Sequence, residues 1–266
     1  MSLTFFFIRE YTPLHKEIFI MPGYIMHLCQ GQYILDNISK YDLRKCSEAI
    51  QSLQHPDAGT ADLFQLGSVL PDAADKSLTH FRPTYQNSLI TKYPDMDLIL
   101  KRYPVNRMTV TDLGILAHLY MDALYVEMFW PQYFRFEDSS NAETTVTDDI
   151  DHVRMTAKSM QHANLTIPIG DFFSDRYFYG DYNVTNSRFK QDFHPAIPQV
   201  TSSQFIIKEC RGCSKTQLAE DLAHFVDTKY PDDSAHTHVF PYEDMCQFIK
   251  DASGRFFELL KKGTVH

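Results

Sequence analysis

The sequence predicts an all-α protein that folds as a single multi-helix domain. In several long segments, apolar residues recur at the three-to-four-residue spacing of an amphipathic helix. Few stretches show the period of two that is typical of strands, and strands do not alternate with helices along the chain. With 266 residues, 44% of them hydrophobic, the chain is long enough to bury a full core.

The N-terminal half contains four expected helices ahead of a long, mostly apolar one at 109–130. Residues 26–38 and 42–54 show a helical pattern, and a shorter helix is expected at 88–101. The apolar segment 61–70 ends at Pro71, which cannot continue a helix. We interpret residues 1–20 as an N-terminal extension and 21–266 as the helical domain.

Residues 109–130 form the longest apolar helical segment, with Thr109 or Thr111 as the expected N-cap. The acidic stretch after it predicts an exposed loop. Beyond that loop, the remaining expected elements are a helix at 149–164, a loop-rich aromatic wall at 165–203 with one helix near 185–192, and amphipathic helices at 215–230 and 242–263.

Charge and composition exclude several classes of protein. The net charge of -9 argues against a broad nucleic-acid-binding surface. No run of 18 apolar residues predicts a transmembrane helix, and the first residues lack the features of a signal peptide. Five cysteines, an odd number, indicate reduced thiols and a cytoplasmic location. The single pair Cys210 and Cys213 lacks the two further ligands of a structural zinc site, so we interpret it as a loop.

The helix expected at 109–130 contains two polar residues within its apolar surface, His118 and Asp122. Their spacing of four places both side chains on one helix face, within reach of a common ion. A neutral imidazole and a carboxylate in this arrangement form half of a zinc site. The alternative is a structural core histidine whose ring N–H is bonded by the carboxylate.

Three further candidate ligands belong to other apolar segments. His27 lies at the start of the first helix, Asp72 directly follows the segment 61–70, and His80 comes eight residues later. Packing alone hardly explains five such residues, because unpaired buried ionisable groups cost free energy. The sequence therefore predicts a metal site formed by His27, Asp72, His80, His118 and Asp122.

Three stretches carry a resemblance to a known family: MPGYIMHL at 21–28, LFQLGSVLPDAADKSLTHF at 63–81 and DLGILAHLYMD at 112–122. In this order they resemble the zinc-dependent phospholipase C superfamily, which also contains single-strand-specific zinc nucleases. The resemblance is closest to the uncharacterised short bacterial branch of that superfamily. It covers residues 21–130, whereas 131–266 match only in length and helical character.

The resemblance implies an all-helical fold with metal ions at the bottom of a cleft. His27 would bind one ion, His80 and His118 would hold another, and Asp122 would bridge the two. Asp72 would bind a metal or act as the catalytic base for the attacking water. Such a centre would hydrolyse a phosphate ester by two-metal activation of water. We expect two zinc ions, with iron or manganese as alternatives, and a small phosphate ester or lipid headgroup as substrate.

The chain departs from the best-known members of the superfamily at two points. Those enzymes use their mature N-terminal tryptophan as a ligand, whereas here residues precede the motif. They also build a third ion site from a histidine soon after HxxxD and a later HxxxE pair. Position 128 is a methionine and no HxxxE occurs, so the sequence predicts two ions rather than three.

Four other residues are secondary candidates. Asp75 and Asp181 are further potential ligands or substrate contacts, with a cap or turn role as the alternative. Lys76 and Arg82 flank His80 and could bind a phosphate, with a solvated surface position as the alternative.

Two rival classes of protein stay open. A helical HD-type phosphohydrolase needs adjacent His and Asp in one helix, but Asp151-His152 has the reversed order. A non-catalytic helical module would use its metal for folding, or would bind a ligand at a degenerate site.

Overall fold

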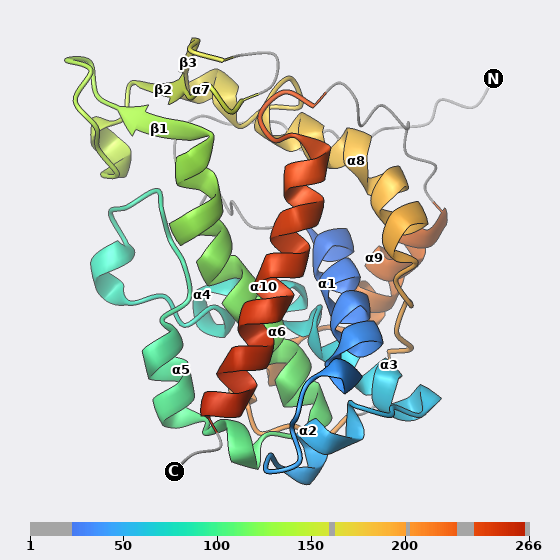
Figure 1. Ribbon diagram of the computed structural model, residues 1–266. Coiled ribbons are helices and arrows are strands. Elements are labelled where there is room, and N and C mark those ends of the chain that lie inside the picture. The colour runs from blue at the N-terminus through green and yellow to red at the C-terminus, as the bar shows by residue number, and fades with distance from the viewer. Residues whose placement is uncertain (1–22, 160–162, 201–202, 228–236, 264–266) are drawn as a thin grey trace.

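The structure is a computed structural model that describes residues 23–159, 163–200, 203–227 and 237–263. The extension predicted for 1–20 lies outside these residues. The described chain is mostly helical, as predicted, but it also contains a three-stranded antiparallel sheet. Figure 1 shows helices α1, α6 and α10 running through the middle of the molecule, with the sheet at one end.

Helix α6 is the central element of the fold. Its N-terminus has a capping box, in which the Asp112 backbone N–H donates to the Thr109 hydroxyl and the Thr109 backbone N–H donates to the Asp112 carboxylate. Nearly every residue of α6 is buried, because helices α1, α3 and α10 all pack against it. These four helices span Tyr24–Asn37 (α1), Ala58–Gly67 (α3), Val110–Leu124 (α6) and Tyr242–Lys262 (α10).

The remaining helices are shorter or more peripheral. They are α2 (Glu48–Ser52), α4 (Lys76–Thr79), α5 (Met96–Arg102), α7 (Ile169–Phe172), α8 (Phe178–Phe193) and α9 (Lys215–Asp227). Short turns of 3-10 helix include η2 (Leu70–Ala73) and η8 (Lys208–Gly212), and α6 continues into a π-helical turn, η5 (Tyr125–Phe129).

Two predicted helices are shorter than expected. Within 42–54 only α2 is α-helical, and within 88–101 the helix begins at Met96. The Asp95 side chain accepts a hydrogen bond from the Leu98 backbone N–H and so marks the true start of α5. Helix α8, in contrast, is longer than the segment 185–192 predicted for it.

The predicted all-α class does not account for the sheet, so the protein is mostly rather than entirely α-helical. Its strands are β1 (Phe134–Glu137), β2 (His152–Met155) and β3 (Thr166–Pro168), paired in that order. The helix predicted at 149–164 is therefore wrong, since its first half contains β2. Val153 faces Phe136 and Ile167 across the sheet and is buried in the core. Strands this short contain too few residues for a periodic pattern to be recognised.

Helices α3 and α6 cross with their backbones in direct contact. A Cβ atom added at Gly114 would overlap the carbonyl oxygen of Phe64, and one added at Gly67 would overlap the carbonyl oxygen of Thr111. Glycine is therefore required at both positions. Because only Ser68 and Val69 separate η2 from α3, this close approach places Asp72 beside α6.

No helix among the described residues is both long and apolar enough to cross a membrane. All five cysteines are free thiols in the part of the chain that the structure describes. Cys210 lies in η8 and Cys213 directly follows it, so the CxxC pair spans a short helical turn rather than a plain loop.

Candidate metal centre

The structure brings the five predicted ligands to one place. Helix α1 supplies His27, η2 supplies Asp72, His80 directly follows α4, and α6 supplies His118 and Asp122. The three histidines and Asp122 are fully buried. The side chain of Asp72 is 6% exposed and lies at the edge of the cluster.

Asp122 lies at the centre of the group. Its Oδ1 is 3.3 Å from His27 Nε2, and its Oδ2 is 3.2 Å from both His80 Nε2 and His118 Nε2. Asp72 Oδ1 lies 3.5 Å from His80 Nε2 and 3.9 Å from His118 Nε2. The two carboxylates and three imidazoles therefore direct their ligand atoms into one shared space.

These separations are those of metal ligands. In a tetrahedral zinc site with bonds of about 2.1 Å, neighbouring ligand atoms are about 3.4 Å apart. Two overlapping triplets have ligand atoms within 4.8 Å of one another: His27, Asp72 and His118, and His80, His118 and Asp122.

The inward-facing atoms lack hydrogen-bond donors. His80 Nε2, His118 Nε2 and both carboxylate oxygens of Asp122 are buried and have no hydrogen-bond partner among the described residues. Buried polar atoms are normally bonded, and each one left unsatisfied costs about 1–3 kcal/mol. A divalent cation among these lone pairs would remove that cost, so the residues fit a metal.

Hydrogen bonds on the far side of two rings set their tautomers. His118 Nδ1 lies 2.8 Å from the carbonyl oxygen of Ser68, which can only accept, so this nitrogen carries the proton. His80 Nδ1 lies 2.9 Å from the Thr79 hydroxyl, which itself donates to the carbonyl oxygen of Pro71 at 2.8 Å. Both rings therefore present an Nε2 lone pair to the centre, as metal-binding histidines do.

The electrostatics of the centre suit a cation. Burial opposes ionisation of Asp122, but the imidazoles of His118 and His27 outweigh it and hold the pKa of this carboxyl well below its ordinary value. For Asp72, burial is likewise outweighed, chiefly by Lys76 and His118, and its pKa is also lowered. Burial lowers the pKa of His27 and keeps that imidazole neutral. The same carboxylates raise the pKa of His118, because Asp122 and Asp72 outweigh the effect of its burial. Metal binding uses ionised carboxylates and neutral imidazoles, so a bound cation would displace the proton that Asp122 and Asp72 favour on His118.

The two carboxylates among the secondary candidates, Asp75 and Asp181, lie elsewhere and hold backbone in place. Asp75 caps α4, because its carboxylate accepts hydrogen bonds from the backbone N–H and the hydroxyl of Ser77. Asp181, buried in α8, accepts the backbone N–H groups of residues 238–240 at 2.5–2.8 Å. Neither carboxylate belongs to the cluster.

Two further residues lie beside the centre. Lys76 contacts Asp72, with Nζ 2.6 Å from Oδ1. Tyr24 lies one helical turn before His27, and its pKa is raised by burial and then by the nearby charges of Asp72 and Asp221. Tyr24 is not among the residues predicted from the sequence, although its spacing from His27 places both on one face of α1.

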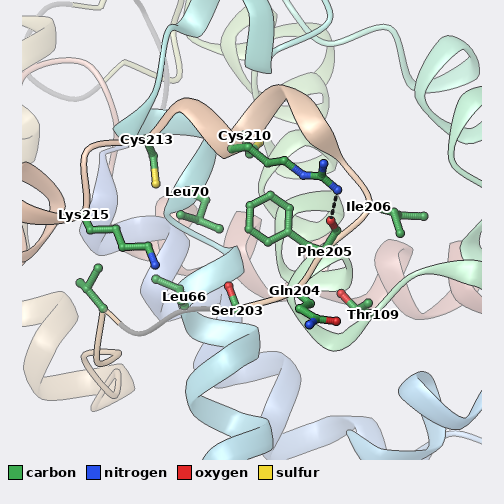
Figure 2. Close-up of a pocket in the computed structure, with 12 residues that line it drawn as sticks. Leu66, Leu70, Thr109, Ser203, Gln204, Phe205, Ile206, Cys210, Cys213 and Lys215 are labelled. Carbon is green, nitrogen blue, oxygen red and sulfur yellow. Dashed lines mark hydrogen bonds between the residues drawn. The ribbon is translucent and has the colours of Figure 1, made fainter.

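A pocket of ≈ 540 Å³ has Leu70, the first residue of η2, in its lining. Figure 2 shows the residues that line it. Leu66 and Leu70 form its floor, and the segment 203–215 forms its wall. Asp112 holds that segment in place, because its carboxylate accepts the backbone N–H groups of Ile206 and Ile207. The residues that line the pocket do not include the five of the cluster.

Comparisons with protein-family models, with curated proteins and with solved structures found no match for this chain. The reversed pair Asp151-His152 lies at β2, away from the five-residue cluster, which gives no support to an HD-type site.

Proposed function

We propose that the protein is a metal-dependent hydrolase of phosphate esters, with two zinc ions as its cofactor and a phospholipase C-like helical fold. One observation carries the proposal: three imidazoles and two carboxylates converge on one buried space, and their inward-facing atoms lack donors. The order of the sequence motifs supports the same class.

The two oxygens of Asp122 suggest how two ions would be divided. Oδ1 faces His27, whereas Oδ2 faces His80 and His118. Asp122 would therefore bridge an ion on the His27 side and an ion held by His80 and His118. Bound zinc would supply Lewis-acid activation of a phosphoryl group and of water.

Asp72 has the position that a base requires. It is the only one of the five side chains with any exposure, 6%, so water and substrate would reach the centre past it. Its lowered pKa keeps the carboxylate ionised, so it can accept a hydrogen bond from water. Asp72 would thus orient the attacking water, in addition to or in place of binding an ion.

Metal analysis and hydrolysis assays on the full chain test the proposal. We expect two zinc ions per chain and hydrolysis of bis(p-nitrophenyl) phosphate, with His118→Ala and Asp122→Asn slower by about 100-fold or more. His55→Ala, at an exposed histidine on another part of the surface, is the matched control and should behave as wild type. If zinc, iron and manganese are all absent and none is taken up on soaking, the proposal is wrong.

The burial of the cluster also favours a second candidate, a non-catalytic module whose metal stabilises the fold. Four of the five ligand side chains are fully buried, as in structural zinc sites. In that case zinc would bind and raise the melting temperature, but wild type and Asp122→Asn would hydrolyse the phosphodiester at the same background rate.

A further inference from the structure

Lys76 approaches the candidate metal centre from the solvent side. It is the first residue of α4 and follows Asp72, a residue of η2, by four positions. Its Nζ is 2.6 Å from Asp72 Oδ1, and its side chain is 24% exposed while that of Asp72 is 6% exposed. The ammonium group therefore lies between solvent and the cluster.

The oxygen that Lys76 contacts is the one directed at the histidines. Asp72 Oδ1 is the same atom that lies 3.5 Å from His80 Nε2 and 3.9 Å from His118 Nε2. A divalent cation bound to these atoms would share Asp72 Oδ1 with the ammonium and repel it. An ammonium has no lone pair, so it cannot itself become a metal ligand.

A negatively charged ligand resolves this repulsion. An oxyanion at the metal ions would place oxygen atoms between the cations and the ammonium, and lysine binds phosphate well as a compact point charge. The partial exposure of Lys76 allows its flexible side chain to turn from Asp72 to such a ligand.

We propose that Lys76 is an anion-binding residue of the metal centre, which holds the phosphoryl oxygens of the substrate once Asp72 is occupied by metal. This inference rests on the proposed function and deepens it, since it assigns the centre an anionic phosphoryl group as its substrate. It also means that Lys76 competes with the metal for Asp72 in the ligand-free protein.

Lys76 competes with metal for Asp72 and also binds the anion, so removing its charge should change zinc affinity and phosphate affinity in opposite directions. In Lys76→Met the competing cation is gone, so zinc should bind about 3-fold to 10-fold more tightly. Inorganic phosphate should bind the zinc-loaded variant about 10-fold or more weakly, because the charge that holds it is missing. Lys76→Arg keeps the charge and should retain phosphate binding within about 3-fold.

The experiment measures binding only. Zinc affinity is measured by chelator competition, and phosphate affinity of the zinc-loaded full chain by isothermal titration calorimetry. Lys101→Met, at an exposed lysine of α5, is the matched control and should change neither affinity. Two competitors of phosphate distinguish a small ester from a lipid headgroup: glycerol phosphate and phosphatidylcholine vesicles. If neither of them competes with phosphate, the assignment of Lys76 to a phosphoryl ligand is contradicted.

The outcomes separate this inference from the proposed function. If wild type binds zinc but Lys76→Met binds phosphate as tightly as wild type, the role of Lys76 is wrong and the metal centre stands. A parallel loss of zinc and phosphate affinity would mean that Lys76 only maintains the structure. Should wild type bind no metal at all, both proposals fall together.

Discussion

In the described part of the chain, two clusters of histidine and carboxylate side chains differ in how their polar atoms are satisfied. At the sheet, His152 contacts Glu137 and Asp151 at 3.0 Å each, and Arg154 Nε donates to Glu137 at 2.7 Å. At the α1–α6 cluster, Asp122 and the three imidazoles face one another, and both Asp122 oxygens lack a donor among the described residues.

The difference shows that proximity of His and Asp residues alone does not indicate a metal site. At the sheet, a guanidinium and an imidazole supply the donors that the carboxylates need, so the network is complete. At the helical cluster, two carboxylates face three imidazoles, and Lys76 contacts Asp72 at the edge of the cluster. A shortage of donors around buried acceptors is therefore the stronger evidence for a cation.

The largest expected effect is the loss of metal from Asp122→Asn. This change removes the negative charge nearest to all three imidazoles, so zinc affinity should fall about 100-fold or more. The stabilisation that zinc confers on wild type should disappear with it. Metal analysis and thermal melts with and without zinc measure both effects, and His152→Gln should retain zinc like wild type. Full zinc occupancy in Asp122→Asn would contradict the claim that the α1–α6 cluster, unlike the cluster at the sheet, binds metal.

Gly114→Ala should disrupt the crossing of α3 and α6, which positions the candidate metal cluster. The histidine and carboxylate cluster at the sheet should be unaffected. The added Cβ would overlap the backbone of α3, so the free energy of unfolding should fall by about 3 kcal/mol or more.

Gly254→Ala is the matched control for this change. It lies within α10, and a Cβ there would meet no described atom within 4 Å. It should stabilise the protein by about 0.5–1 kcal/mol. Denaturant unfolding of the metal-free protein measures both variants. Equal stabilities for the two variants would contradict the close crossing.

His152→Gln should have a smaller effect that is confined to stability. The variant loses ionic hydrogen bonds at the sheet, and we expect the free energy of unfolding to fall by about 1 kcal/mol. Zinc stoichiometry should stay unchanged, because His152 does not belong to the α1–α6 cluster. A loss of zinc from this variant would show that the two clusters are coupled.

The smallest effect concerns the pH dependence of the sheet cluster. The pKa of His152 is raised above 6.5, chiefly by Asp151, so its contribution to stability is complete below pH 6.5 and is lost as pH rises through the folded-state pKa.

The pKa of Glu137 is lowered below 4.5, chiefly by Arg154, so its contribution is complete above pH 4.5 and is lost as pH falls through the folded-state pKa. The stability difference between wild type and His152→Gln should therefore be greatest between pH 4.5 and 6.5. Melting temperatures across pH 4 to 9 measure it, and a difference that grows above pH 7 would contradict the assignment.

Several features of the candidate site could be predicted from local spacing. The i, i+4 relation of His118 and Asp122 places both on one face wherever the helix lies, and Thr109 has the sequence context of an N-cap. The sequence also indicates His27, Asp72 and His80, because each is an ionisable residue at an apolar segment and such residues need partners.

Other features depend on contacts between distant segments. The helix predicted at 149–164 was wrong because four residues of β2 carry little periodic signal, and pairing with β1 and β3 decides their conformation. Asp181 is chemically suited to a metal site, yet the backbone of residues 238–240 uses its carboxylate.

The helical class and the cap of α6 follow from the chain alone, because helix formation and capping depend on residues a few positions apart. The candidate ligands follow from it as well, because they are ionisable residues at apolar segments, which need partners. Which of the buried histidines and carboxylates lack donors depends on how α1, α3 and α6 pack. That packing depends on glycine contacts and on neighbours far away in the sequence, which no local pattern contains.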